Sequence, residues 1–287
     1  MGSNDLAEGQ TEEKSEVTGE ARRLALLVEY EGTNYAGFQL QADEPTIQGE
    51  IERALFAFLG EQIRIRGASR TDSGAHALGQ VIDFTTDSRY SAETFVGALN
   101  YHLPEDIRVT RARDVANSFN SRRDAVSRVY RYRILNRPIP SPLSRRHCHW
   151  IRDPLQIEKM SQAARHLIGT HDFRPLAPGH PADRSAVRTV YRWEVSQEQD
   201  SEDTIAVICE ANGFMLHQIR RTNAVLAEVG KGRWPPESVL QILGETGRKL
   251  ESVLTSNIPS LPARGLCLVE VKYRDQLWKV EQHHETN

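Results

Sequence analysis

The stretch GASRTDSGAHALGQVIDF, residues 67–84, links two predicted strands and places the acidic residue Asp72 in the loop between them. Before the loop, QIRIRGA (62–68) alternates apolar and basic residues, and after it QVIDFTT (80–86) is rich in β-branched and aromatic residues. Both patterns are typical of strands. Thr-Asp-Ser-Gly is also a common turn, because Asp bonds its own downstream amides and Gly allows unusual dihedral angles. The loop alone therefore fits either a plain turn or a functional site.

The segments on either side of the loop give the order of the first half. A helix is predicted where apolar residues recur at four-residue spacing, with Thr46 as N-cap and Gly60 as stop signal. A second helix begins with a capping motif at Ser91 and ends near Pro104. The predicted elements are a strand at 23–32, a helix at 46–60, strands at 62–68 and 80–86, a helix at 91–103 and a strand at 107–115. This β-α-β-β-α-β order is the split βαβ pattern of a ferredoxin-like half.

A second series of elements follows and repeats much of this order. Strands are predicted at 128–134, 189–196, 204–212 and 265–273, and helices at 154–169, 214–230 and 235–245. The expected fold class is α+β, with two ferredoxin-like halves whose antiparallel sheets join into one larger sheet. We place the boundary in the proline-containing stretch 137–153, which gives halves at 22–145 and 146–275.

Composition describes an ordinary globular protein, with 39% hydrophobic and 26% charged residues. No apolar run approaches the roughly 20 residues that a bilayer requires, and the N-terminal residues lack a hydrophobic signal core, so we expect a cytoplasmic protein with no membrane contact. Residues 1–21 hold six acids among Gly, Ser and Thr and predict a disordered acidic tail; 276–287 is expected to be a second tail. Cys148, Cys209 and Cys267 form no metal-type pair and are expected to be reduced.

Positive charge is concentrated in residues 108–152, which contain twelve arginines and only two acids, Asp114 and Asp124. A solvated charged face would explain part of this bias. A surface that binds phosphate explains the near absence of acids better.

Several kinds of site are not supported by the sequence. His147 and His149 should share one strand face, but no second pair stands at ligand spacing, so no metal is predicted. The phosphate loops GxxxxGK[ST] and GxGxxG are absent, as is the GxSxG of serine hydrolases. A hydrolase with paired carboxylates would need an acid beside Asp72. Asp83 and Glu210 are the candidates, although Asp83 is expected to be an exposed edge residue.

The neighbours of Asp72 favour a site over a turn. Arg70 lies two residues away, where a bidentate pair would keep the carboxylate ionised and oriented, and the Gly74 backbone would let a planar ligand approach. An ionised carboxylate is a competent nucleophile at a sugar or an activated ring carbon.

ASRTDSGAHALGQVIDF resembles the catalytic loop of the tRNA pseudouridine synthase A family, with Ser69 in place of the family's usual Gly. The resemblance continues in order over nearly all of residues 24–273. It includes VEYEGTNYAGFQLQ, TIQGEIERAL, FNSRRDAVSRVYRYRI, HDFRPL, ANGFMLHQIRRTNAVLAEVGKG and LPARGLCL. It implies the pseudouridine synthase fold, an isomerase activity, and no cofactor or metal.

The resemblance also implies residue roles. Asp72 is the nucleophile, Arg70 the arginine beside it, and Arg220 the arginine that pairs with it. Tyr130 stacks on the target uracil, while Arg122 and Arg128 occupy basic positions near the RNA. Along the strand Tyr130 and Tyr132 share one face and Arg131 and Arg133 the other, so these two arginines need not both face RNA. For Tyr132, packing is the better interpretation.

The implied reaction converts uridine to pseudouridine in the anticodon arm of tRNA, with uridines 38, 39 and 40 as targets. A homodimer with one tRNA spanning both subunits is expected on the same ground. The alternative is a non-catalytic tRNA-binding protein that has the same basic stretch and sheet aromatics.

Overall fold

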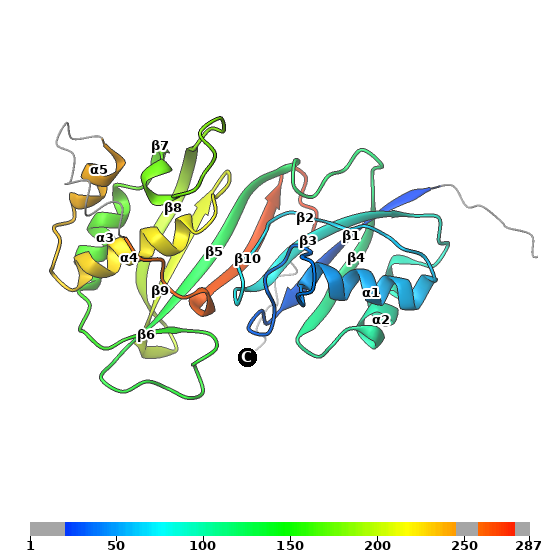
Figure 1. Ribbon diagram of the computed structural model, residues 1–287, viewed down its shortest axis with the longest axis horizontal. Coiled ribbons are helices and arrows are strands. Elements are labelled where there is room, and N and C mark those ends of the chain that lie inside the picture. Colours follow the sequence, from blue (N-terminus) through cyan, green and yellow to red (C-terminus); the bar gives the residue numbers. More distant parts are fainter. Residues whose placement is uncertain (1–20, 245–257, 279–287) are drawn as a thin grey trace, which may run out of the picture.

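A ten-stranded sheet forms the centre of the molecule, with the helices in front of it in Figure 1. The computed structural model describes residues 21–244 and 258–278. The strand order is β4-β1-β3-β10-β5-β9-β8-β7, with β2 beside β3 and β6 beside β5. The strands are β1 (Arg22–Tyr30), β2 (Arg66–Gly67), β3 (His76–Thr86), β4 (Ile107–Val115), β5 (Ala125–Asn136), β6 (His149–Ile151), β7 (Gly169–Asp172), β8 (Val187–Glu198), β9 (Ser201–Ala211) and β10 (Leu266–Tyr273). The helices are α1 (Ile47–Leu59), α2 (Ala92–His102), α3 (Ile157–Arg165), α4 (Gln218–Gly230) and α5 (Ser238–Leu243), and the 3₁₀ turns are η1 (Arg174–Leu176) and η2 (Ala263–Gly265).

Each half has the strand order of a ferredoxin-like unit. In the first, β4, β1, β3 and β2 lie side by side, and in the second β10, β5, β9 and β8 repeat that order. The α+β class with two joined halves is therefore confirmed. This strand order groups β5 with the second half, whereas the predicted division into 22–145 and 146–275 places it in the first; that division stays a prediction.

The last strand joins the two halves. Strand β10 runs antiparallel to β5 and parallel to β3, where Cys267 and Leu268 face His76 and Ala77 in register. The predicted strand at 62–68 shrinks to two residues, Arg66 and Gly67, opposite the other end of β3. The joined sheet is mixed at this seam because β10 runs parallel to β3, and the two strands pair at the end of β3 nearest the Asp72 loop.

Local signals set most element ends as expected. Thr46 Oγ1 accepts from the Gly49 N–H, and Gly60 ends α1 in the left-handed region at φ 75°. Ser91 caps α2 by accepting from the Thr94 N–H. Helix α4 begins at Gln218, later than the predicted 214, because the Gln218 side chain accepts from the Met215 N–H and holds the preceding residues out of the helix.

Asp83 corrects a prediction made from the sequence. It is fully buried on β3, a central strand, and was expected at an exposed edge. Its Oδ2 lies 2.6 Å from an Arg23 nitrogen and 2.5 Å from an Arg66 nitrogen, and its Oδ1 accepts from the Ser121 N–H at 2.9 Å. Two arginines and a backbone amide compensate for the buried charge. Asp83 is thus a structural anion.

His147 and His149 also differ from expectation. They do not share a strand face: the His147 ring lies tilted against that of His76, with centroids 5.0 Å apart, whereas His149 lines a cavity beside Trp234. His147 precedes β6, so strand alternation does not apply to the pair.

The expected acidic tail at 1–21 lies, except for its last residue, outside the described residues, as does most of the expected tail at 276–287. Within the described ranges, none of the helices has the length and apolar character needed to cross a membrane.

Candidate active site

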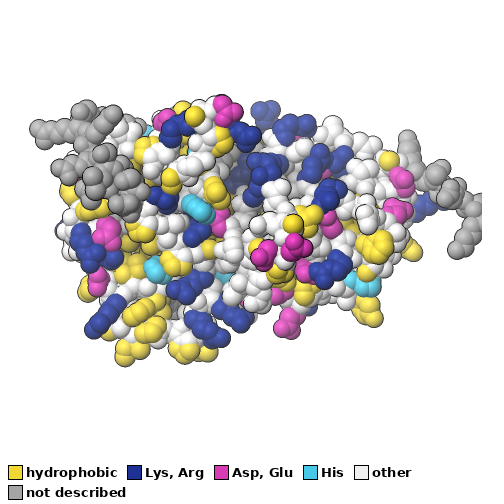
Figure 2. Space-filling view, in the orientation of Figure 1, with side chains coloured by type: hydrophobic (Ala, Val, Ile, Leu, Met, Phe, Trp, Pro, Cys, Tyr) yellow, Lys and Arg dark blue, Asp and Glu magenta, His cyan; other side chains and the backbone are white. Residues whose placement is uncertain are grey.

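A cavity of about 710 Å³ lies between the two halves and contains Asp72. The first half contributes the loop that follows β2, and the segment between β4 and β5 contributes Arg122. The second half contributes residues 212–220 and four residues of the segment before and at the start of β8, His180, Arg184, Ser185 and Arg188. Figure 2 shows Lys and Arg side chains close together in the upper middle of the molecule, over the junction of the halves. The arginines that line the cavity are Arg70, Arg122, Arg128, Arg184, Arg188 and Arg220.

Asp72 contacts two side chains of the second half, Arg220 and His217. Its Oδ2 accepts from Arg220 Nη1 at 2.7 Å and lies 3.8 Å from His217 Nε2. The Asp72 side chain is 13% exposed and that of Arg220 is 15% exposed, so the pair is partly shielded from water. The geometry therefore supplies an oriented carboxylate that is open to the cavity.

The loop around Asp72 is fixed mainly by its backbone. The Thr71 carbonyl accepts from the Phe38 N–H at 3.2 Å, and the Thr71 hydroxyl lies 2.8 Å from the buried Tyr30 hydroxyl. The Asp72 carbonyl accepts from the Ala75 N–H, closing a turn in which Gly74 has φ 77°. Only glycine adopts such a dihedral at low cost. Gly74 therefore serves the turn itself, and the expected approach of a planar ligand to its backbone stays a prediction.

Arg220 is placed by the first turn of α4. Its Nε donates to the Leu261 carbonyl at 2.6 Å, and its Nη1 donates to Asp72, so two hydrogen bonds fix the orientation of the guanidinium. His217 is the N-cap of this helix and has φ 59° and ψ 0°. A non-glycine residue in the left-handed region is uncommon and costs about 1 kcal/mol or more. Sequence reasoning missed His217; its place three residues before Arg220 was the available signal.

The expected pair between Arg70 and Asp72 is not formed. Among the described residues, the ion pairs of Asp72 go to Arg220 and His217, and Arg70 is exposed. The Arg70 guanidinium forms no ion pair with a described residue, although both side chains line the same cavity. Burial, together with the charges of Arg122 and Arg184, lowers the pKa of Arg70. Arg70 therefore acts on the cavity as a separate positive charge.

Tyr130 lies in the wall of the cavity, as its expected role requires. Its ring meets that of Phe214 edge to face, with centroids 5.4 Å apart, and its hydroxyl lies 2.6 Å from Ser69 Oγ. The side chain is only 4% exposed, and burial raises the pKa of its hydroxyl. The phenol is therefore neutral and anchored at its tip.

Replacing Ser69 by Ala is expected to lower the free energy of unfolding by about 1–3 kcal/mol, because the buried Tyr130 hydroxyl loses its partner. Urea denaturation measures the loss. Tyr130→Phe is the matched variant: the double mutant should lose less than the sum of the two single losses. Strict additivity would contradict a coupling between the two hydroxyls.

Arg128 and Arg122 behave differently from each other. Arg128 is buried, and its guanidinium donates to four backbone carbonyls, those of Ala68, Arg122, Ala125 and Asn212. Burial lowers the pKa of Arg128. It thus ties the Asp72 loop to β9 and to the segment before β5. The Arg122 side chain is exposed at the cavity.

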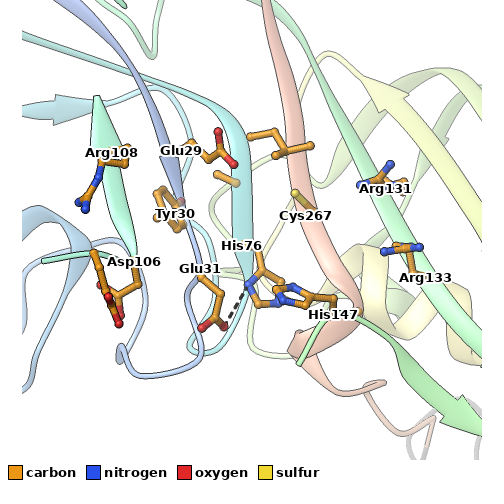
Figure 3. A pocket seen from close by; sticks show the side chains of 14 residues that line it. Glu29, Tyr30, Glu31, His76, Asp106, Arg108, Arg131, Arg133, His147 and Cys267 are labelled. Atoms are coloured by element: carbon orange, nitrogen blue, oxygen red, sulfur yellow. Dashed lines mark ion pairs between the residues drawn. The ribbon is translucent and has the colours of Figure 1, made fainter. Parts of the chain in front are cut away.

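The two faces of β5 carry the residues expected from strand alternation. Tyr132 is fully buried and its hydroxyl donates to the Pro262 carbonyl at 2.8 Å, which confirms the packing interpretation. Arg131 and Arg133 point instead into a separate cavity of about 250 Å³ beside Cys267 and His147 (Figure 3). Neither of them lines the cavity that holds Asp72.

Asp72 is the one acid among the described residues that line its cavity. Asp83 is occupied by two arginines, and Glu210 accepts from Ser127 Oγ at 2.5 Å and from Lys272 at 2.9 Å. Neither candidate partner acid lies in the cavity, so this site lacks the paired carboxylates that the hydrolase interpretation requires.

Comparison with known proteins agrees with the family resemblance found in the sequence. The family model described as tRNA pseudouridine synthase matches residues 26–122 and 163–274. The tRNA pseudouridine synthase A of Thermoanaerobacter sp. (strain X514) is 39% identical over 252 residues, which cover 88% of this chain and 100% of that protein. The tRNA pseudouridine synthase A of Myxococcus xanthus is 40% identical over 254 residues, covering 88% of this chain and 92% of the relative. The protein of the same name from Bartonella henselae is 37% identical over 254 residues.

Proposed function

Because this chain belongs to the tRNA pseudouridine synthase family, we propose that it isomerises uridine in the tRNA anticodon arm with Asp72 as the nucleophile. Membership confirms the resemblance found in the sequence and makes the protein an isomerase that acts on uridine in tRNA. The residue roles and uridines 38, 39 and 40 are the proposal. So are the homodimer and the cytoplasmic location, which rest on the resemblance and on the nature of the substrate.

One observation carries the assignment of the nucleophile. Asp72 is the only carboxylate among the residues known to line a cavity that six arginines share, and Arg220 holds it at 2.7 Å. The surrounding positive charge attracts RNA to the cavity. An ionised, oriented carboxylate in a site built for a polyanion fits nucleophilic attack on a nucleotide.

The isomerisation balances without a co-reactant. The Asp72 carboxylate adds to C1′ or to the uracil ring, the N1–C1′ bond breaks, and the base turns so that a C5–C1′ bond forms. The carboxylate is then released, C5 loses its proton, and N1 gains one. Arg220 keeps the carboxylate oriented before attack and after its release.

Access to a uridine in a stem requires the base to leave the helix, which costs a few kcal/mol. Tyr130 places an aromatic ring in the cavity wall, and stacking of a base on an aromatic ring contributes about 1–3 kcal/mol per base. Arg122 and Arg70 contribute positive charge beside it. Arg128 acts as a positioning residue, since its donors are occupied by backbone carbonyls.

The target positions are tested with transcripts of one tRNA that carry tritium at C5 of uridine. A parent transcript with uridine at 38, 39 and 40 is compared with three variants, each with cytidine at one of these positions. In each variant, tritium release should fall by the fraction of the parent's release that comes from the replaced position. A transcript with all three positions replaced should release none. Full release from the triple variant would show that the uridine set is wrong while leaving the isomerase assignment intact.

A further inference from the structure

Three arginines from separate parts of the chain meet at the cavity. Arg70 comes from the Asp72 loop, Arg122 from the segment between β4 and β5, and Arg184 from the segment between η1 and β8. All three side chains are exposed, and all three line the cavity that holds Asp72. They form an arginine cluster, Arg70, Arg122 and Arg184, that the second half completes.

Among residues 21–244 and 258–278, the arginine cluster has no acidic partner. None of the three guanidinium groups has a hydrogen bond or ion pair to another described residue, whereas Arg192 pairs with Glu194 and Arg233 with Asp153. Asp72 is occupied by Arg220. Asp183, the acid next to Arg184 in the sequence, is exposed and does not line the cavity.

Unpaired like charges oppose one another. Partial burial of the Arg70 guanidinium and the charges of Arg122 and Arg184 all lower the pKa of Arg70, although an arginine keeps its proton at neutral pH. A fold that holds these charges together without an acid gains when an anion binds between them. Guanidinium groups match the oxygens of a phosphate with two parallel hydrogen bonds each.

We propose that Arg70, Arg122 and Arg184 form one phosphodiester-binding site, which holds the RNA backbone beside the nucleotide that enters the Asp72 cavity. The site rests on the proposed function for the identity of its ligand as RNA. Arg184 is its new member. The segment that carries Arg184 is fastened by Arg174, whose Nη2 donates to the Arg184 carbonyl at 3.0 Å and whose Nη1 donates to the Pro181 carbonyl at 3.3 Å.

The test measures the dissociation constant of tRNA for the full-length protein as a function of salt. Asp72→Asn is the parent for all variants, so that the tRNA stays unmodified during the measurement. Arg184→Gln removes the charge, and Arg184→Lys keeps the charge but loses the planar guanidinium group. At 0.1 M salt, Arg184→Gln should raise Kd about tenfold. The plot of log association constant against log salt concentration should become less steep, its slope falling in magnitude by about 0.7–0.9.

Arg184→Lys should keep the slope of the parent, because a lysine also neutralises one phosphate. Arg192→Gln is the control. On β8, Trp193 packs against Phe214 on the cavity side of the sheet. Arg192 is the neighbouring residue on the same strand and therefore points to the opposite face. Its Kd and slope should match those of the parent.

An unchanged slope in Arg184→Gln would overturn the proposal. So would an equal loss of affinity in the Gln and Lys variants with the slope kept, since that pattern marks stacking on a base. Failure of the proposed function looks different, because the wild-type protein would then bind tRNA and release no tritium from C5 of uridine.

Discussion

Asp72→Asn is expected to reduce the rate of tritium release from 5-tritiated uridine in tRNA by roughly 10⁴-fold or more, because an amide oxygen is not a competent nucleophile. The substitution keeps the shape of the side chain. In the wild-type protein Arg220 Nη1 lies 2.7 Å from Asp72 Oδ2, and the asparagine keeps one oxygen that can accept from Arg220. The tRNA dissociation constant should stay near that of the wild type, since the arginines of the cavity are untouched. Single-turnover release with enzyme in excess separates the chemical step from binding.

Asp200→Asn is the matched control. Asp200 is an exposed acid in the turn between β8 and β9, outside the cavity, so its loss removes one negative charge without touching the site. Release by this variant should equal that of the wild type. If Asp72→Asn kept a rate within tenfold of the wild type, Asp72 would not be the nucleophile, whatever the tRNA affinity.

Asp83→Ala is expected to lower the free energy of unfolding by about 3–5 kcal/mol. The carboxylate is fully buried and lies 2.6 Å and 2.5 Å from nitrogens of Arg23 and Arg66. Its removal leaves the largely buried Arg23 guanidinium, whose side chain is 17% exposed, without a counter-charge. The Ser121 N–H loses its acceptor as well. Urea denaturation followed by circular dichroism measures the change.

The comparison variant is Glu194→Gln, which breaks the exposed pair between Glu194 and Arg192. An exposed pair contributes about 0–1 kcal/mol, so this variant should unfold close to the wild-type midpoint. A loss of less than about 1 kcal/mol in Asp83→Ala would show that Asp83 is not a structural anion.

Much of the fold was readable from local patterns. The four-residue apolar spacing, the Thr46 cap and the Gly60 stop fixed α1 to within a residue, and the alternation of β5 separated Tyr130 from Arg131. Strands β6 and β7, with three and four residues, were missed because such short segments carry no periodicity.

Features that depend on long-range contacts were less accessible. The burial of Asp83 follows from Arg23 and Arg66, which β1 and β2 bring to it from other parts of the chain. The link between Arg220 and Asp72 came from family resemblance and could not come from spacing. Arg184 joins Arg70 only because the second half folds over the Asp72 loop, and nothing near Arg184 in the sequence signals this.

The central claim, isomerisation of uridine in tRNA by this cavity, is tested most directly by following one tRNA through a complete reaction. The transcript carries tritium at C5 of uridine, and the products are the released tritium, the nucleosides of the digested tRNA, and any free uracil. We expect one pseudouridine for each tritium released and no free uracil. Binding of the tRNA without tritium release would contradict the claim in favour of a binding protein, and free uracil would contradict it in favour of a hydrolase.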